Sequence, residues 1–312
     1  MPTCQDQPDA AQVYLSDLSP KDKPWDRHRT QATAVSTLYR RARPDYADRI
    51  ADCSKLLGFR LSPDLSGSGD LGLKLHSARF CRVRHCPVCQ WRRSMRWRAR
   101  FLDALPRLVA DHPTARFIFL TLTVRNCPVT DLRATLAAMG KAWQRLSQRK
   151  TWPALGWVRS VEVTRNPTTG EAHPHYHVLM AVRPNYFSRN YINQATWREL
   201  WQSALRVDYL PVVNVKTVKP DKDGSVAVGV LEVLKYGVKP EDLEFSEAWL
   251  LALTEQLHKT RAVAVGGIFK EYISEEEPED LIGESEEEEA GDSSDLYFGW
   301  RESYKRYLKI NH

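Results

Sequence analysis

Apolar and polar residues alternate along several short segments of this chain, while other segments carry apolar residues three and four positions apart. The first spacing is the period of a strand and the second that of one helix face. The expected strands cover 115–126, 155–166, 171–180, 212–218 and 261–270, and the expected helices cover 131–150, 193–206 and 229–239. Short strands interleaved with helices predict an α+β fold with a central antiparallel sheet and flanking helices.

Three histidines occupy alternate positions in one expected strand. His173, His175 and His177 stand before an apolar run, so all three imidazoles are expected on one face of a buried strand. His175 and His177 are predicted to bind one metal ion. A hairpin would bring Glu162 alongside as the third ligand, with His173 as its competitor. Histidines packed without a metal are the alternative.

Cysteines near the middle of the first half are spaced as metal ligands in the stretch FCRVRHCPVC. Tetrahedral zinc takes four ligands, and a CPVC turn supplies two of them. The predicted Zn²⁺ ligands are Cys53, Cys81, Cys86 and Cys89. His76 and His85 are alternatives for the fourth position, and ordinary buried thiols are the alternative to a metal site. Cys4 and Cys127 are expected to stay unligated.

The charge distribution indicates a polyanionic partner. Residues 271–295 hold thirteen acids and no Lys or Arg, and removing these charges from the net +6 leaves +19 on the rest of the chain. A body this basic is expected to bind nucleic acid. The acidic run is expected to be disordered, either as a solvated linker or as a shield of the basic surface.

Eight arginines and no acid lie between Arg79 and Arg100. Guanidinium groups bind phosphate as planar forks, and Trp91 and Trp97 among them either stack on bases or belong to a core. Hydroxyls on one face of the first expected strand are further candidates. The predicted DNA contacts are Arg82, Arg84, Arg92, Arg93, Arg96, Thr121 and Thr123.

A glutamate and a tyrosine share one face of the expected helix 229–239. Glu232 and Tyr236 are four residues apart, and Lys235 and Lys239 form a second four-spaced pair beside them. A tyrosine hydroxyl with a pKa near 10 is a poor nucleophile unless cations or a metal assist it, and a nearby glutamate can accept its proton or activate water. Taken alone, the pairing is also typical of an exposed helix.

Together these residues resemble the HUH endonucleases, and within them the rolling-circle replication initiators of small bacterial plasmids. The resemblance rests on FLTLTVRN, HPHYHVLM with its unit His175-Tyr176-His177, and EVLKYGVK, together with the cysteine stretch before them. It covers about 50–270. It implies an antiparallel sheet with helices on one side, preceded by a small zinc-binding subdomain.

The resemblance also implies roles. Tyr236 would attack a phosphodiester of single-stranded DNA at an origin hairpin, keep the 5′-phosphate and release a 3′-OH for a polymerase. The histidine site would hold Mn²⁺ or Mg²⁺, Glu232 would activate water at termination, and a host helicase would unwind ahead. A transposase with the same chemistry is one alternative, although such enzymes often carry two tyrosines. A non-catalytic zinc-dependent DNA-binding regulator and an unrelated metal-dependent hydrolase are the others.

The sequence predicts a cytoplasmic protein with no membrane partner. No apolar run of about 20 residues is present, and the N-terminus lacks the pattern of a signal peptide. The oligomeric state is left open.

The expected organisation of the chain has five parts. They are an N-terminal extension (1–45), a zinc-binding, Arg/Trp-rich segment (46–105), the nuclease domain (106–272), an acidic disordered linker (273–295) and a C-terminal helix (296–312).

Overall fold

A computed structural model describes residues 12–63, 71–219, 233–234, 237–278, 280–282 and 295–310. The chain divides into two compact units. The first comprises Met1–Arg92 with Asp280–His312, and the second comprises Arg93–Glu279. In the parts described, no helix combines the length and apolar character needed to cross a membrane.

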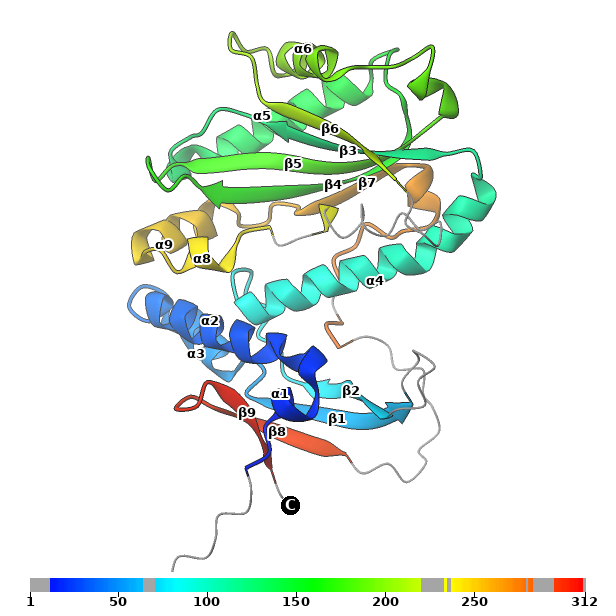
Figure 1. The fold of residues 1–312 in the computed structure, drawn as a ribbon. Helices are drawn as coiled ribbons and strands as arrows, with labels where there is room; N and C mark the ends of the chain where they lie inside the picture. The colour runs from blue at the N-terminus through cyan, green and yellow to red at the C-terminus, as the bar shows by residue number, and fades with distance from the viewer. Residues whose placement is uncertain are drawn as a thin grey trace, which may run out of the picture. The chain divides into compact units, whose positions relative to one another are not determined.

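The second unit contains a five-stranded antiparallel sheet with the strand order β6-β3-β5-β4-β7 (Figure 1). Its strands are β3 (Arg116–Thr123), β4 (Ala154–Arg165), β5 (Ala172–Val182), β6 (Val213–Val218) and β7 (Val263–Gly267). All five strands expected from the alternation are therefore present, and the α+β fold is confirmed. β7 ends at Gly267, before the 3₁₀ turn Ile268–Glu271. Position 267 requires a glycine because its φ is 60° and an added Cβ would lie 2.1 Å from the Leu155 carbonyl oxygen.

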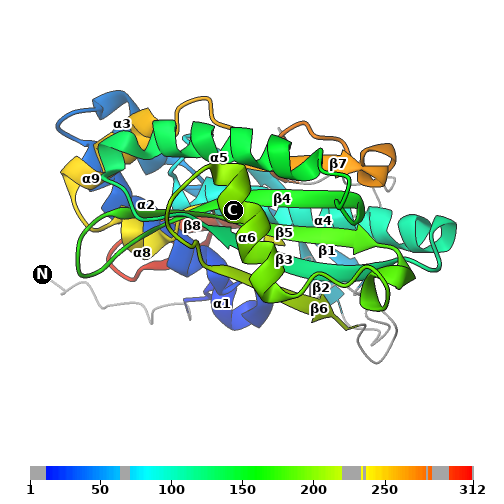
Figure 2. The same cartoon turned by 90° about the horizontal axis from the view of Figure 1, so that it is seen from above.

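Helices cover both faces of this sheet, so the expectation of helices on one side is wrong. Helices α5 (Leu132–Ser147) and α6 (Gln194–Leu205) lie over one face (Figures 1 and 2). Helix α4 (Pro87–Asp111), from Arg93 onward, packs on the other. The buried strands alternate apolar side chains to both faces, and each face needs its own cover.

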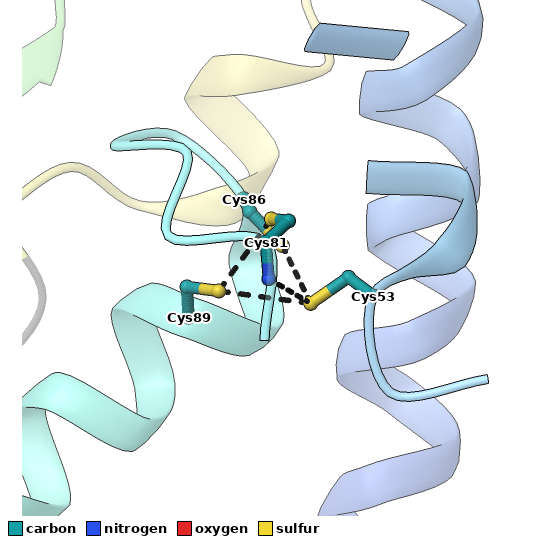
Figure 3. A group of neighbouring side chains, drawn as sticks. All are labelled: Cys53, Cys81, Cys86 and Cys89. Atoms are coloured by element: carbon teal, nitrogen blue, oxygen red, sulfur yellow. Dashed lines mark hydrogen bonds between the residues drawn. The ribbon is translucent and has the colours of Figure 1, made fainter. Parts of the chain in front are cut away.

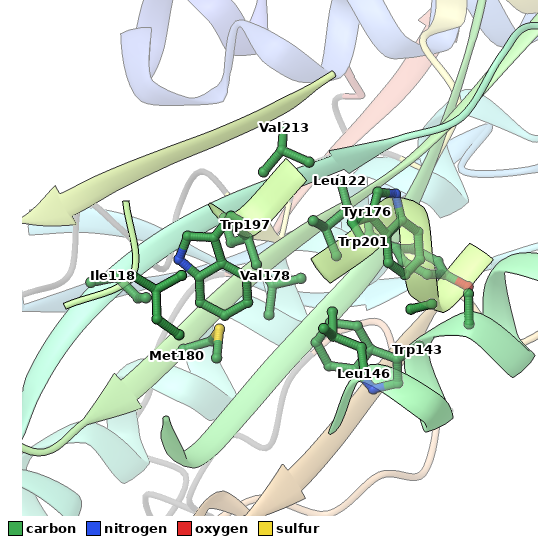
Figure 4. Packing of buried hydrophobic residues seen from close by; sticks show 14 of the residues in the cluster. Ile118, Leu122, Trp143, Leu146, Tyr176, Val178, Met180, Trp197, Trp201 and Val213 are labelled. Atoms are coloured by element: carbon green, nitrogen blue, oxygen red, sulfur yellow. The ribbon is translucent and has the colours of Figure 1, made fainter. Parts of the chain in front are cut away.

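The even-numbered residues of β5 face α5 and α6. Tyr176, Val178 and Met180 are buried there with tryptophans of both helices (Figure 4). The odd-numbered Leu179 faces α4 instead, in a second cluster. That second cluster contains Trp97, Phe101, Leu105, Leu108, Phe117, Val158 and Val265. Trp97 is therefore a core residue, and the base-stacking alternative does not apply to it.

The remaining helices of the second unit are short. They are α8 (Pro240–Leu243), α9 (Glu247–Gln256) and the 3₁₀ segments η2 (Val129–Asp131), η3 (Pro184–Phe187) and η4 (Ile268–Glu271). The expected helix 229–239 falls largely outside the described residues.

The first unit contains a four-stranded sheet with the order β2-β1-β8-β9. Its elements are α1 (Leu15–Leu18), η1 (Pro20–Asp22), α2 (Pro24–Tyr39), α3 (Pro44–Asp52), β1 (Leu56–Pro63), β2 (Leu71–Ala78), β8 (Leu296–Arg301) and β9 (Arg306–Ile310). Segments from the two ends of the chain thus build one sheet, because β8 pairs with β1. The predicted N-terminal extension (1–45) belongs to this unit, and so does the predicted zinc-binding segment up to Arg92. The rest of that segment, from Arg93 to residue 105, belongs to the second unit.

Two predictions about the C-terminal part are corrected. Residues 296–310 form the β8–β9 hairpin instead of a helix, because β8 pairs with β1 on one side and with β9 on the other, and this pairing buries Phe298 and Trp300. The acidic stretch is also partly ordered. Ile273 and Leu281 are buried, and Glu275 lies 3.4 Å from an Arg261 guanidinium nitrogen, so the expected linker is structured at its start.

Candidate metal centres and DNA-binding residues

The β4–β5 hairpin places Glu162 directly opposite His175 in the antiparallel register. On the other side of β5, Thr121 is opposite His177. Residues opposite each other in an antiparallel pair project from the same face, so these side chains converge on the face that α4 partly covers. The expected hairpin is thus present and brings the carboxylate to the histidines.

One oxygen of the Glu162 carboxylate lies 3.1 Å from His175 Nε2 and 2.7 Å from His177 Nε2. Glu162 and His175 are each 8% exposed, so the group is nearly buried. Burial raises the pKa of Glu162, but hydrogen bonds with the two histidines lower it by more and hold it well below its ordinary value. The carboxylate is therefore charged and faces two imidazoles in a site with little water.

The second nitrogen of each imidazole fixes its orientation. His175 Nδ1 donates to the His173 carbonyl at 3.1 Å, which leaves its Nε2 as the nitrogen that faces Glu162. His177 Nδ1 lies 3.4 Å from the Thr121 hydroxyl. Such outer partners select the tautomer of a metal-binding histidine. Both rings are thus held with Nε2 toward a common point.

His173 does not join this group. Its Nδ1 lies 2.6 Å from the Asn126 side-chain oxygen, and its pKa is lowered by burial and by nearby His175. The candidate ligand atoms of Glu162, His175 and His177 lie within 4.8 Å of one another. Ligands at about 2.1 Å from one ion and at right angles to each other are about 3 Å apart, so these residues fit a single divalent cation.

Four cysteines form a second candidate metal centre, in the first unit (Figure 3). Cys53 follows α3, Cys81 lies in the loop after β2, and Cys86 and Cys89 flank the start of α4. Sulfur pairs are 3.6 Å apart for Cys53–Cys89 and Cys81–Cys89 and 3.7 Å apart for Cys86–Cys53. Tetrahedral zinc with Zn–S bonds of 2.3 Å requires about 3.8 Å, so the cluster fits a Zn²⁺ ion.

The surroundings of the four cysteines favour the binding of a cation. Hydrogen bonds with Cys81 and burial raise the pKa of Cys53, and burial raises that of Cys86. Four thiolates this close repel one another unless a metal ion balances them. Neither of the alternative ligands, His76 and His85, belongs to the group. His76 Nε2 instead lies 3.6 Å from the Asp295 carboxylate.

Three of the predicted catalytic residues, Glu232, Lys235 and Tyr236, lie outside the described residues, whereas Lys239 is exposed. The described residues beside them form hydrogen bonds with other elements of the second unit. The Leu234 carbonyl accepts from the Ser94 hydroxyl at 2.5 Å, and the Gly237 carbonyl accepts from the Val163 amide at 2.9 Å. Val163 is the residue after Glu162.

The predicted DNA contacts differ in their surroundings. Arg82 is exposed, whereas Arg84, Arg93 and Arg96 are half-buried. Arg92 is buried, and its guanidinium donates to the Leu281 and Ile282 carbonyls at 2.7 and 2.8 Å. Thr123 is 8% exposed and donates to the Val212 carbonyl at 2.9 Å. The side chains of Arg92 and Thr123 thus donate hydrogen bonds to backbone carbonyls inside the protein.

Sequence reasoning missed two residues around the histidine site. Asn126 holds His173, and Ser160 donates to the Val233 carbonyl at 2.5 Å. The position of Ser160, two before Glu162 on an alternating strand, was the available signal that it shares the face of the site.

A sequence model described as "Replication protein" matches residues 72–308 of the chain. Because this match covers most of the chain, the protein belongs to that family, the Rep initiators of plasmid rolling-circle replication. Membership implies that it binds origin DNA.

Individual relatives agree with this assignment. "Protein rep" of Streptococcus pneumoniae serotype 2 (strain D39 / NCTC 7466) is 32% identical over 305 residues, which is 93% of each chain. "Protein rep" of Lentilactobacillus hilgardii is 36% identical over 84% of this chain and 85% of its own, and that of Lactiplantibacillus plantarum is 37% identical over 75% and 80%. No solved structure gave a significant match.

Proposed function

We propose that this initiator nicks one strand of origin DNA by attack of the Tyr236 hydroxyl on a phosphodiester. The new bond joins the tyrosine oxygen to the 5′-phosphate, and the bond from phosphorus to the 3′ oxygen breaks. The hydroxyl proton passes to a base, for which Glu232 is the candidate, and the leaving oxygen takes up a proton to become a 3′-OH. A polymerase can extend that end, and reversal of the step rejoins the strand.

Glu162, His175 and His177 would hold the divalent cation, Mn²⁺ or Mg²⁺. When bound, it would draw negative charge from the phosphate oxygens. Glu162 would contribute a fixed negative charge, and Thr121 and the His173 carbonyl would keep the imidazoles oriented. Lys235 and Lys239 would favour the anionic form of the tyrosine by their positive charge. The four cysteines would hold Zn²⁺ as a structural ion.

The observation that carries the proposal is the convergence of one carboxylate and two imidazole nitrogens on one point of the sheet. It is supported by the neighbours of the tyrosine. Leu234 and Gly237, on either side of the Lys235–Tyr236 pair, bond to α4 and to β4, whose residue Glu162 is part of the convergence. A nucleophile carried between those two residues has only a short length of chain to reach the metal site.

The test uses single-stranded oligonucleotides covering the plasmid origin, Mn²⁺ and denaturing electrophoresis. Wild-type protein is expected to give a DNA-shifted band that resists boiling, and Tyr236→Phe to give none. Tyr191 is 60% exposed in the same unit, so Tyr191→Phe is the matched control and should keep the band. His175→Ala should lose it.

Three outcomes would contradict the proposal. Metal-dependent cleavage without an adduct would make water the nucleophile, as in the hydrolase alternative. Specific binding of origin DNA without any cleavage would indicate a regulator. An adduct that forms at two tyrosines would point to transposase-type chemistry. A host helicase and polymerase are the partners that the released 3′-OH would require.

A further inference from the structure

We propose that the exposed edge of the nuclease sheet, formed by Phe119, Asn214 and Lys216, binds the nucleotides next to the scissile phosphate. The inference rests on the proposed function, because it assumes single-stranded DNA at the histidine site. It adds a direction: the DNA leaves the metal site across β3 and β6, and not across β4 and β7.

The strand register places these residues on the face of the metal site. Thr121 pairs with His177 on one side and with Asn214 on the other. One step along, Phe119 pairs with Leu179 and with Lys216. Because paired residues share a face, a row runs from the imidazole of His177 through Thr121 to Asn214, with Lys216 and Phe119 in the next row.

The two ends of these rows differ in their exposure to solvent. Toward β7, the Ser160 hydroxyl is bonded to the Val233 carbonyl, and Ser160 is 6% exposed. The residues Val233 and Leu234 pack in the same core cluster as α4 and close that side. Toward β6, both Asn214 and Lys216 are exposed. In the described part of the chain, β6 is the outermost strand on that side of the sheet.

The chemistry of this edge fits a single strand of DNA. Phe119 is half-buried, and its ring centroid lies 5.5 Å from that of His177 at an interplanar angle of 33°, so it offers an aromatic surface beside a metal ligand. Aromatic surfaces combined with cations are how proteins hold single strands. Lys216 supplies the charge for a phosphate, and the Asn214 amide can both donate to and accept from a base edge.

The first test measures salt dependence in the Tyr236→Phe background, so that no cleavage occurs. The probe is a single-stranded oligonucleotide selected for tight binding to that variant. Each phosphate contact to a single strand contributes about −0.7 to the slope of log affinity against log salt. Lys216→Gln should therefore reduce the steepness by about 0.7. Lys141 is exposed on α5, over the opposite face, and Lys141→Gln should leave the slope unchanged.

The second test addresses stacking. Phe119→Leu keeps an apolar side chain for the core and removes the ring, and loss of one stacked base corresponds to about a 5- to 150-fold weaker affinity. A 2-aminopurine placed next to the cleavage position should be quenched in the Tyr236→Phe background and become brighter when Phe119→Leu is added. A thermal melt of each variant shows whether the fold is intact.

The results separate the two hypotheses. An unchanged salt slope in Lys216→Gln, or unchanged fluorescence in Phe119→Leu, overturns the edge subsite even if the wild type forms the tyrosine adduct. Absence of the adduct in the wild type overturns the nicking proposal, and the binding measurements still decide the route of the DNA.

Discussion

His173 shares its strand face with His175 and His177 but has a different partner. Its Nδ1 is 2.6 Å from Asn126, whereas the Nε2 atoms of the other two histidines face Glu162. A residue whose ring is held by an amide contributes orientation and packing, while a ligand contributes a bond to the ion. The three histidines are therefore expected to respond differently to substitution.

We predict that His175→Ala and Glu162→Ala each abolish Mn²⁺ binding in the micromolar range, because each removes one of three protein ligands. His173→Ala should leave Mn²⁺ binding measurable in that range. Electron paramagnetic resonance of free Mn²⁺ in a titration measures all three. Loss of binding in His173→Ala equal to that in His175→Ala would show that His173 is the third ligand.

Helix α2 contains a buried histidine, His28, whose protonation should affect stability. Burial and the nearby Arg27 guanidinium lower the pKa of His28 from 6.5 to about 4, and Arg27 lies 3.3 Å from its Nε2. The ring stacks on Trp91 with centroids 4.8 Å apart. The folded state thus holds this imidazole neutral, while the unfolded chain protonates it near its ordinary pKa.

Because the unfolded chain binds a proton that the folded state does not, the free energy of unfolding decreases as the pH falls. The contribution of His28 to this free energy is fully present above about pH 6.5 and is lost as the pH falls toward about 4. The loss at pH 5 is about 2 kcal/mol. Urea unfolding of wild type and His28→Gln at pH 7.5 and pH 5 measures it. The wild type should lose more stability between these values than the variant, and equal losses would exclude His28 as the source.

The cysteine cluster joins elements that lie far apart in the sequence. Cys53 follows α3, and Cys89 lies in the first turn of α4. We predict that Cys53→Ser removes the bound zinc and lowers the melting temperature, because a structural zinc site contributes to folding directly. Cys127→Ser is the control, since Cys127 lies outside the cluster. Elemental analysis and thermal melts give the two readouts; retention of zinc in Cys53→Ser would contradict the assignment.

The elements that the sequence predicted well are those with a clear period. Alternation located β3 to β6, and helical spacing located α5 and α6. Glu162 was found because a short turn fixes the register of its hairpin. The residues 296–310 were misread because Trp300, Tyr304 and Tyr307 also have helical spacing, and only pairing with the distant β1 selects the strand. The inward turn of Arg92 also depends on a partner, Leu281, that is remote in sequence.

At the scale of the whole molecule, the two ends of the chain meet in the first unit. The Tyr307 hydroxyl in β9 donates to the Ser54 carbonyl at 2.7 Å, and its backbone amide donates to Asp26 at 3.1 Å. Ser54 follows the zinc-ligand candidate Cys53. The C-terminal strand thus contacts the segment that carries a candidate metal ligand.

We predict that Tyr307→Phe destabilises the protein by about 1–3 kcal/mol, because the buried Ser54 carbonyl loses its donor. The loss should also speed the release of zinc to a chelator, which a colorimetric metal indicator follows. Tyr304 is 53% exposed, so Tyr304→Phe should change neither quantity. Equal release rates in wild type and Tyr307→Phe would separate the terminal strand from the metal site.

Among the described strands, β6 lies at the border of its sheet, and this position has a consequence for solubility. An outermost strand presents backbone groups that another copy of the chain can pair with, and charged side chains, lysine above all, discourage such association. β6 carries Lys216 at its exposed face. If this residue also binds DNA, then one lysine serves recognition when DNA is present and keeps the protein monodisperse when it is not. Replacing it with valine should therefore promote aggregation of the DNA-free protein, which light scattering would detect.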